Sequence, residues 1–226
     1  MNLNECNMKK YAIIVAGGSG TRMGSEVPKQ FLILAGKPIL MHTILKFKSE
    51  VDEIIVVLPQ NQFDYWSDLC VEYSFLESIK IVAGGKSRFE SVKNGLNTIA
   101  ENGIVAVHDA VRPFVNQAII KEAFDVAIEK GNAVVSVLLN DSIREVNEFG
   151  NKSVDRTCYR LIQTPQCFEV NFLKTAYEQE EKSTFTDDAS VVESIGAKIN
   201  LTQGSYDNIK ITTPSDLVIG EAILKK

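Results

Sequence analysis

The chain has 226 residues, of which 45% are hydrophobic and 23% are charged, and its formal net charge is −5. These proportions are ordinary for a globular protein, and the length suits one large domain or two small ones. The acidic balance argues against a nucleic-acid-binding protein, because such proteins rely on a positively charged surface. We also expect no contact with a membrane, since no run approaches about eighteen consecutive apolar residues.

The first seven residues, MNLNECN, have no apolar core and do not resemble a secretory signal. They are either a disordered tail or a stretch upstream of the true start at Met8. The cysteines at positions 6, 70, 158 and 167 form no C-x-x-C pair, which argues against a zinc site and a redox motif. Without a secretion signal, we expect reduced thiols and a cytoplasmic protein.

Five short apolar runs within the first 137 residues predict strands. They are rich in Val and Ile and continuously apolar, which is typical of strands buried on both faces of a parallel sheet. Helical patterns separate them. The clearest covers residues 116–130, with Asn116 as N-cap and Gly131 at the stop. The alternation predicts an α/β fold, a Rossmann-like three-layer sandwich with a mostly parallel sheet. The predicted strands are residues 11–15, 54–58, 79–82, 104–107 and 133–137.

The pattern changes between residues 138 and 163, where no helix is predicted. Two runs, residues 142–146 and 153–161, flank the turn-like residues 147–151 and predict a protruding β-hairpin arm. A hairpin cannot bury itself alone, so we expect 138–163 to be a dimerisation arm that packs against a partner subunit in a homodimer.

Helical patterns resume after the predicted arm, at residues 169–181 and 187–194, and Thr186 is the expected N-cap of the second. The last helix begins at Thr213, with Pro214 at its first position. No linker or internal repeat divides the chain, so residues 8–226 are predicted to form a single domain.

A glycine-rich, basic segment runs from Ala16 to Gln30, directly after the first predicted strand. Its glycines allow backbone N–H groups to converge on a phosphate at the edge where open α/β sheets bind ligands. Arg22 and Lys29 add the positive charge that a triphosphate requires. A tight turn would explain one glycine, but not three together with two cations. The segment therefore predicts a nucleoside triphosphate site. The glycines are Gly17, Gly18 and Gly20.

Two better-known phosphate motifs fail here. The dinucleotide fingerprint needs a sixth-position glycine, where the count from Gly18 gives Met23. The Walker motif has its ending in Gly85-Lys86-Ser87, but position 80 is lysine rather than glycine.

A second cluster follows the strand predicted at residues 104–107. Asp109 lies at the ligand edge, where a carboxylate beside a triphosphate suits a Mg²⁺ ligand, although an isolated Asp is more often a cap. Arg112 is expected to pair with substrate or a neighbouring carboxylate. His108 is expected to be structural. The chain has only two histidines, which disfavours a catalytic triad.

Two further features are weaker alone. The loop Gly84-Gly85-Lys86-Ser87-Arg88 precedes a helical pattern that contains Ser91, and it suits a ligand loop or a plain β–α turn equally. Lys210 lies in a short apolar run, where a lysine is often only an edge residue.

Taken together, these segments resemble the 2-C-methyl-D-erythritol 4-phosphate cytidylyltransferases of isoprenoid synthesis. The resemblance covers nearly all of the chain from Tyr11 onward, in the family's order. The glycine segment is common to many sugar-phosphate nucleotidyltransferases, whereas TDDAS and DNIKIT are more discriminating. Ribitol-5-phosphate cytidylyltransferase is a near relative that shares several segments. The matching segments are AGGSGTRMGSEVPKQF, GGKSRFESV, HDAVRPF, TPQ, TDDAS and DNIKITTP.

The resemblance implies a nucleotidyltransferase-type fold and a role for each matching residue. Arg22 and Lys29 would contact the CTP phosphates and stabilise the transition state, and Lys210 would complete the catalytic set. Asp109 would help bind Mg²⁺. Residues around the nucleotide would be Ala16, Gly17, Gly18, Gly20, Gly84, Gly85, Ser91, Asp109 and Ala110. Residues for the polyol phosphate would be Arg112, Thr164 and Thr186, with Ser142, where the family often has Thr, and Arg156 acting across the dimer.

The implied reaction transfers CMP from CTP to 2-C-methyl-D-erythritol 4-phosphate and releases pyrophosphate. The nucleophile is an acceptor phosphate oxygen, already anionic at neutral pH, so no general base is needed. Two alternatives stay open: a cytidylyltransferase for ribitol 5-phosphate, and a CTP-binding protein without turnover. The pair Arg22 and Lys29 disfavours the second, because pure binding needs fewer groups directed at a transition state.

Overall fold

A computed structural model describes residues 8–17 and 27–225. The predicted tail at residues 1–7, and Gly18, Gly20 and Arg22 of the glycine-rich segment, lie outside the described residues.

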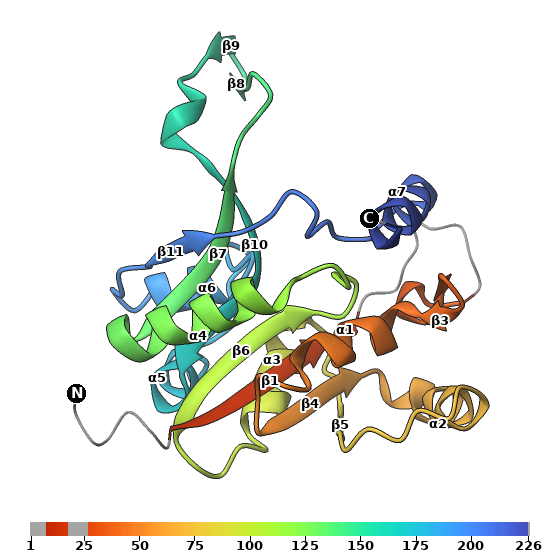
Figure 1. Ribbon diagram of the computed structural model, residues 1–226. Coiled ribbons are helices and arrows are strands. Elements are labelled where there is room, and N and C mark those ends of the chain that lie inside the picture. Colours follow the sequence, from red (N-terminus) through yellow and green to blue (C-terminus); the bar gives the residue numbers. More distant parts are fainter. Residues whose placement is uncertain (1–7, 18–26, 226) are drawn as a thin grey trace.

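A seven-stranded sheet forms the centre of the fold, in the order β11-β7-β10-β6-β1-β4-β5 (Figure 1). All pairings are parallel except those of β10, which runs antiparallel between β6 and β7. All five predicted strands are confirmed, whereas β10 and β11 were not predicted. The strands are β1 (Lys9–Val15), β4 (Glu53–Leu58), β5 (Lys80–Ala83), β6 (Gly103–Asp109), β7 (Asn132–Leu138), β10 (Arg160–Glu169) and β11 (Leu201–Gln203).

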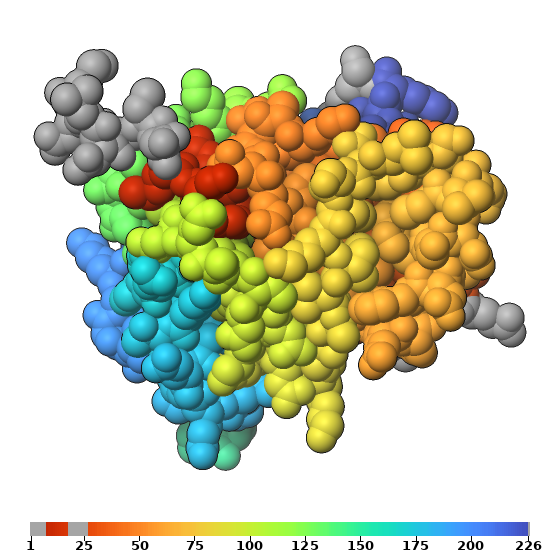
Figure 2. Space-filling model, turned by 90° about the horizontal axis from the view of Figure 1, so that it is seen from below, coloured from red at the N-terminus to blue at the C-terminus, as the bar shows by residue number. Residues whose placement is uncertain are grey.

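Helices cover both faces of the sheet, which confirms the three-layer sandwich. On one face α1 (Ile39–Phe47), α2 (Phe63–Glu72) and α4 (Gln117–Lys130) share a buried cluster with side chains of β1 and β4. On the other face α3 (Arg88–Leu96), α5 (Val170–Ala176) and α6 (Asp188–Glu193) do the same. Figure 2 shows this face from below, with the yellow-green surface around α3 next to the cyan surface around α5.

The ends of several helices follow the capping chemistry expected from the sequence. In α4, the Asn116 side chain accepts a hydrogen bond from the Ile119 N–H, and Gly131 ends the helix at a φ of 86°. The predicted start of α7 (Pro214–Leu224) is also confirmed, since Asp216 accepts from the Thr213 N–H at 2.8 Å. Before α6 the prediction was off by one residue: Asp187, not Thr186, is the N-cap, because its carboxylate accepts from the Ser190 N–H.

A third, smaller cluster places α7 against the carboxyl end of β6. Leu217 and Ile223 of α7 pack there against a buried cluster. Its members are Val111, Phe114 and Ile211, with Leu34 of the short strand β2 (Ile33–Leu34) and Ile39, which follows β3 (Lys37–Pro38). Short 3₁₀ turns complete the described chain: η3 (Lys29–Phe31), η4 (Gln60–Gln62) and η5 (Arg156–Cys158).

The predicted arm is present and projects from the body between β7 and β10 (Figure 1). Its strands are β8 (Arg144–Asn147) and β9 (Gly150–Ser153), so β9 begins inside the predicted turn and ends where the second strand was predicted to start. Residues 160–163 belong instead to β10, which pairs with β7 from Arg160 opposite Leu138.

The predicted helix at residues 169–181 is shorter than expected. It covers Val170–Ala176, with Glu169 as its N-cap. Within the described residues, none of the helices combines the length and apolar character needed to span a bilayer.

Candidate active site

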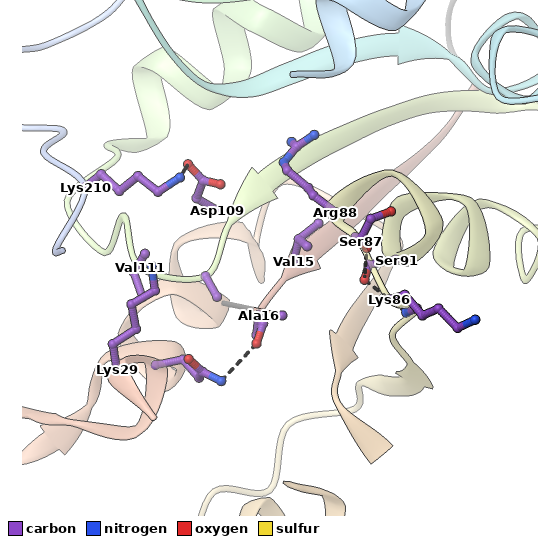
Figure 3. A pocket seen from close by; sticks show the side chains of 14 residues that line it. Val15, Ala16, Lys29, Lys86, Ser87, Arg88, Ser91, Asp109, Val111 and Lys210 are labelled. Carbon is purple, nitrogen blue, oxygen red and sulfur yellow. Dashed lines mark hydrogen bonds and ion pairs between the residues drawn. The ribbon is translucent and has the colours of Figure 1, made fainter. Parts of the chain in front are cut away.

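Two adjoining cavities of about 290 Å³ each open beside the carboxyl ends of β1 and β6. The first, here called the glycine-loop cavity, is drawn in Figure 3. It is lined by Val15, Ala16, Gly17, Lys29, Gln30, Gly85, Lys86, Ser87, Arg88, Ser91, Asp109, Ala110, Val111 and Lys210. The second, the β10 cavity, is lined by Arg88, Asp109, Arg112, Ile162, Gln163, Thr164, Gln166, Thr186, Asp187 and Lys210.

Ser91 organises one wall of the glycine-loop cavity. Its hydroxyl accepts from the Gly85 N–H at 3.1 Å and donates to the Ser87 carbonyl at 2.8 Å, which fixes the loop before α3. A Cβ atom at Gly85 would come within 2.2 Å of the Glu90 Cβ, so glycine is required there. Gly84 packs against Ser91 just behind this wall and does not line the cavity.

Asp109 is the centre of charge of the site. Its Oδ2 atom lies 3.0 Å from Lys210 Nζ and 3.1 Å from Arg112 Nε (Figure 3 for the Lys210 contact). Burial opposes ionisation of this carboxyl group, but the positive charges of Lys210, Arg88 and Arg112 outweigh it and hold its pKa well below the usual range. Asp109 is therefore anionic at any physiological pH.

His108 and Thr164 fix the backbone around Asp109. The Asp109 N–H donates to Thr164 Oγ1 at 3.1 Å, and Thr164 Oγ1 lies 3.0 Å from His108 Nδ1. His108 Nε2 lies 3.1 Å from the Arg112 carbonyl. Because the Arg112 carbonyl can only accept, Nε2 carries a proton, and in the neutral ring Nδ1 then accepts from the Thr164 hydroxyl. Burial lowers the pKa of His108 to about 4, in agreement with the structural role expected from the sequence.

The floor of the β10 cavity is a polar network between β10 and α6. Gln166 donates to Asp187 Oδ2 at 2.8 Å and accepts from the Ala189 N–H at 2.9 Å. Arg112 donates to the Asn208 carbonyl at 2.8 Å, so its guanidinium is held by two elements. The lining of this cavity also includes the cations of Arg88 and Lys210 and the hydroxyl groups of Thr164 and Thr186, which suits a small phosphorylated polyol.

Arg88 lies where the two cavities meet. Its guanidinium forms a bidentate pair with the fully buried Asp188, at 3.0 and 2.5 Å. Asp188 also accepts from the Tyr177 hydroxyl at 2.6 Å. Although burial alone would lower it, these interactions raise the pKa of Arg88 above its ordinary value. Arg88, Asp109 and Lys210 line both cavities.

The family to which this site belongs follows from comparison with known proteins. A model of the family "2-C-methyl-D-erythritol 4-phosphate cytidylyltransferase" matches residues 10–226. The chain belongs to that family. A member from Bacteroides thetaiotaomicron is 50% identical over 96% of this chain and 100% of its own, and one from Bacteroides fragilis is 48% identical with the same shares.

Solved structures agree with this assignment. The 4-diphosphocytidyl-2C-methyl-D-erythritol synthase of Anaerococcus prevotii superposes with a TM-score of 0.83 at 27% identity, over 97% of each chain. The 2-C-methyl-D-erythritol 4-phosphate cytidylyltransferase of Thermus thermophilus gives 0.77 at 28%, over 97% of this chain and 100% of its own. The chain is therefore a cytidylyltransferase with the fold of this family.

The structure brings together most of the site residues predicted for this cytidylyltransferase. Ser142 and Arg156 line neither cavity, since both lie in the arm. The prediction gave no role of their own to five residues that line the cavities: Gln30, Gln163, Gln166, Arg88 and Asp187. Four of them, Gln30, Arg88, Gln166 and Asp187, lie inside the segments that carry the resemblance, but their residue type and spacing alone predict no role.

The donor set fits a Mg²⁺ ion that is held jointly with substrate. Within the described residues, His, Cys, Asp and Glu do not gather in a group of three or more that could hold a metal ion. Mg²⁺ is commonly bound by one or two carboxylates together with substrate phosphates. Asp109 is anionic, and Lys210 and Arg112 both contact its Oδ2 atom, so Oδ1 is the oxygen that a cation would use.

Proposed function

We propose that the glycine-loop cavity binds CTP and that the β10 cavity binds 2-C-methyl-D-erythritol 4-phosphate. The chain then transfers CMP to the acceptor, releases pyrophosphate and forms 4-diphosphocytidyl-2-C-methyl-D-erythritol. The names of its relatives give this acceptor for one of them and this product for another. The observation that carries the proposal is that Arg88, Asp109 and Lys210 line both cavities. An anionic acceptor and a triphosphate would meet at this junction.

The transfer needs positioning and charge rather than a base. An oxygen of the acceptor phosphate, already anionic, forms a bond to the α-phosphorus of CTP. The bond from that phosphorus to the oxygen that bridges to the β-phosphate breaks, and pyrophosphate leaves with the electron pair. Lys29 and Lys210 would balance the charge on the α-phosphate and the leaving group, together with Arg22 of the glycine-rich segment.

The remaining cavity residues would hold the substrates. Ala16, Gly17, Gly85 and Ala110, with the loop ordered by Ser91 and Gly84, would surround the nucleoside and its phosphates. Arg112, Thr164 and Thr186 would bind the polyol phosphate. Asp109 would bind Mg²⁺ through Oδ1, and the ion would neutralise phosphate charge when bound.

The arm would complete the site of a second copy in a homodimer. Its strands β8 and β9 are exposed throughout, and Phe149 at its tip is 90% exposed. A lone two-stranded hairpin with such apolar side chains is marginal in water and suits a partner surface. Ser142 and Arg156 would then reach the partner's β10 cavity.

Because CTP is supplied in the cytoplasm, we propose that the enzyme acts there.

Purified protein with CTP and Mg²⁺ tests the proposal directly. We expect pyrophosphate release with 2-C-methyl-D-erythritol 4-phosphate and little with ribitol 5-phosphate. Release with ribitol 5-phosphate alone would assign the chain to the near relative. Tight CTP binding without consumption for any acceptor would instead indicate a nucleotide-binding protein.

A further inference from the structure

Gln30 is a fully buried amide at the wall of the glycine-loop cavity. Its Nε2 donates to the Ala16 carbonyl at 2.9 Å and to Gln62 Oε1 at 2.8 Å. Both protons of the amide nitrogen are therefore used. Figure 3 shows the bond to Ala16 beside Lys29.

This one amide connects the two ends of the glycine-rich segment. Ala16 directly follows β1, and its N–H donates to the Val57 carbonyl of β4 at 2.9 Å, which anchors it to that strand. Lys29 and Gln30 share the single 3₁₀ turn η3, and both line the cavity. Because adjacent residues in one turn move together, the bond from Gln30 to Ala16 sets where the Lys29 backbone stands relative to β1.

Packing alone does not explain an amide at this position. The neighbouring Phe31 is itself buried, stacks on Trp66 and meets Tyr65 edge to face, with ring centroids 6.1 and 5.2 Å away, so η3 already has an apolar anchor. The Oε1 atom of Gln30 is buried without a hydrogen-bond partner within the described residues. Such an atom costs free energy that an apolar side chain of similar size would avoid.

We propose that Gln30 is a positioning residue for nucleotidyl transfer, which holds Lys29 in register with Ala16 so that the ammonium meets the reacting phosphates. The proposal rests on the proposed function of the glycine-loop cavity. Gln30 does not contact substrate in this proposal, because both protons of its amide nitrogen are donated to Ala16 and Gln62.

The variant Gln30→Met keeps the volume and removes both bonds. We expect kcat to fall by roughly 10- to 100-fold, because misplacement by about an ångström has effects of this size, with the KM for the acceptor little changed. Asn132→Leu is the matched control, since it removes a buried amide at the amino end of β7, away from both cavities. It should lower the melting temperature and leave kcat within about twofold.

A double-mutant cycle separates positioning from general loosening of the fold. In a Lys29→Ala background, Gln30→Met should lower kcat less than about twofold further, because there is no ammonium left to misplace. An undiminished loss in that background, or wild-type kcat in the single variant, would overturn the proposal. If the wild type itself consumed no CTP with any acceptor, the proposed function would fail instead.

Gln30→Glu keeps the proposal testable if Gln30→Met does not fold. Only a protonated carboxyl group can donate to the Ala16 carbonyl, so the activity of this variant relative to wild type should rise as the pH falls. A ratio that is independent of pH would contradict the assignment.

Discussion

Lys29 enters the glycine-loop cavity from a single 3₁₀ turn. Because it would balance charge that develops on the phosphates, Lys29→Ala should lower kcat by roughly 10²–10³-fold, as the loss of an oxyanion donor does. Lys29→Arg should recover only part of this, since a planar guanidinium replaces a compact ammonium. Steady-state kinetics would measure both effects. Lys121→Ala, an exposed lysine on α4, is the control, and equal turnover in all variants would remove Lys29 from the mechanism.

The buried His108 should make the free energy of unfolding depend on pH. Its folded pKa of about 4 lies below the ordinary value of 6.5, so the unfolded chain takes up the proton first. Stability is therefore lost as the pH falls from 6.5 towards 4. At pH 5 this group should cost the wild type about 2 kcal/mol relative to pH 7, at 1.36 kcal/mol for each pKa unit.

Urea unfolding of wild type and His108→Gln at both pH values would measure that cost. The variant should lose about 2 kcal/mol less than the wild type between pH 7 and pH 5, because it has no imidazole to protonate. An identical pH dependence in the two proteins would show that His108 titrates normally in the fold.

The arm can be removed without interrupting the central sheet. Leu138 of β7 pairs directly with Arg160 of β10, so residues 139–159 can be replaced by an Asn-Gly turn that joins the two strands. We expect a folded monomer that still binds CTP but no longer turns over the acceptor, because Ser142 and Arg156 are gone. Light scattering and calorimetry would measure this.

A monomeric intact protein would contradict the role of the arm, as would an arm-deleted protein with full turnover. The alanine variants Ser142→Ala and Arg156→Ala in the intact chain should raise the acceptor KM without changing the mass in solution.

An element can be predicted from the sequence when its own residues determine it, and not when contacts with distant residues do. The five parallel strands are continuously apolar, and α4 carries its own cap at Asn116 and stop at Gly131, so both were predictable. β10 was not, because its polar residues from Gln163 to Gln166 lie at a register shift and face the cavity. β11 pairs along only three residues, Leu201–Gln203, too few for a periodic pattern.

The same distinction holds for the site. Lys29 and Asp109 were predictable because each follows a strand at the edge where ligands bind. Arg88 was not, since its role depends on Asp188, one hundred residues away, and on the Tyr177 hydroxyl. The role of Gln30 was not predictable either, because it depends on hydrogen bonds to Ala16 and Gln62.

The topology of the central sheet brings the two cavities to one edge. The carboxyl ends of β1 and β6 lie side by side, with Val15 paired to Asp109, so Ala16 and Gly17, which follow β1, line the same cavity as Asp109. The antiparallel β10 adds Thr164 and Gln166 from the other side of β6. The net charge of −5 is thus compatible with anionic substrates, because the cations are concentrated where the cavities join.

The central claim is that an oxygen of the acceptor phosphate attacks CTP at this junction. The most direct test uses 2-C-methyl-D-erythritol 4-phosphate labelled with ¹⁸O in all its phosphate oxygens, with ³¹P NMR and mass spectrometry of the products. We expect one pyrophosphate without label for each diphosphate product, and a product that keeps every acceptor oxygen, including the one between its two phosphorus atoms. Label in the pyrophosphate, or CMP in place of the diphosphate, would contradict it.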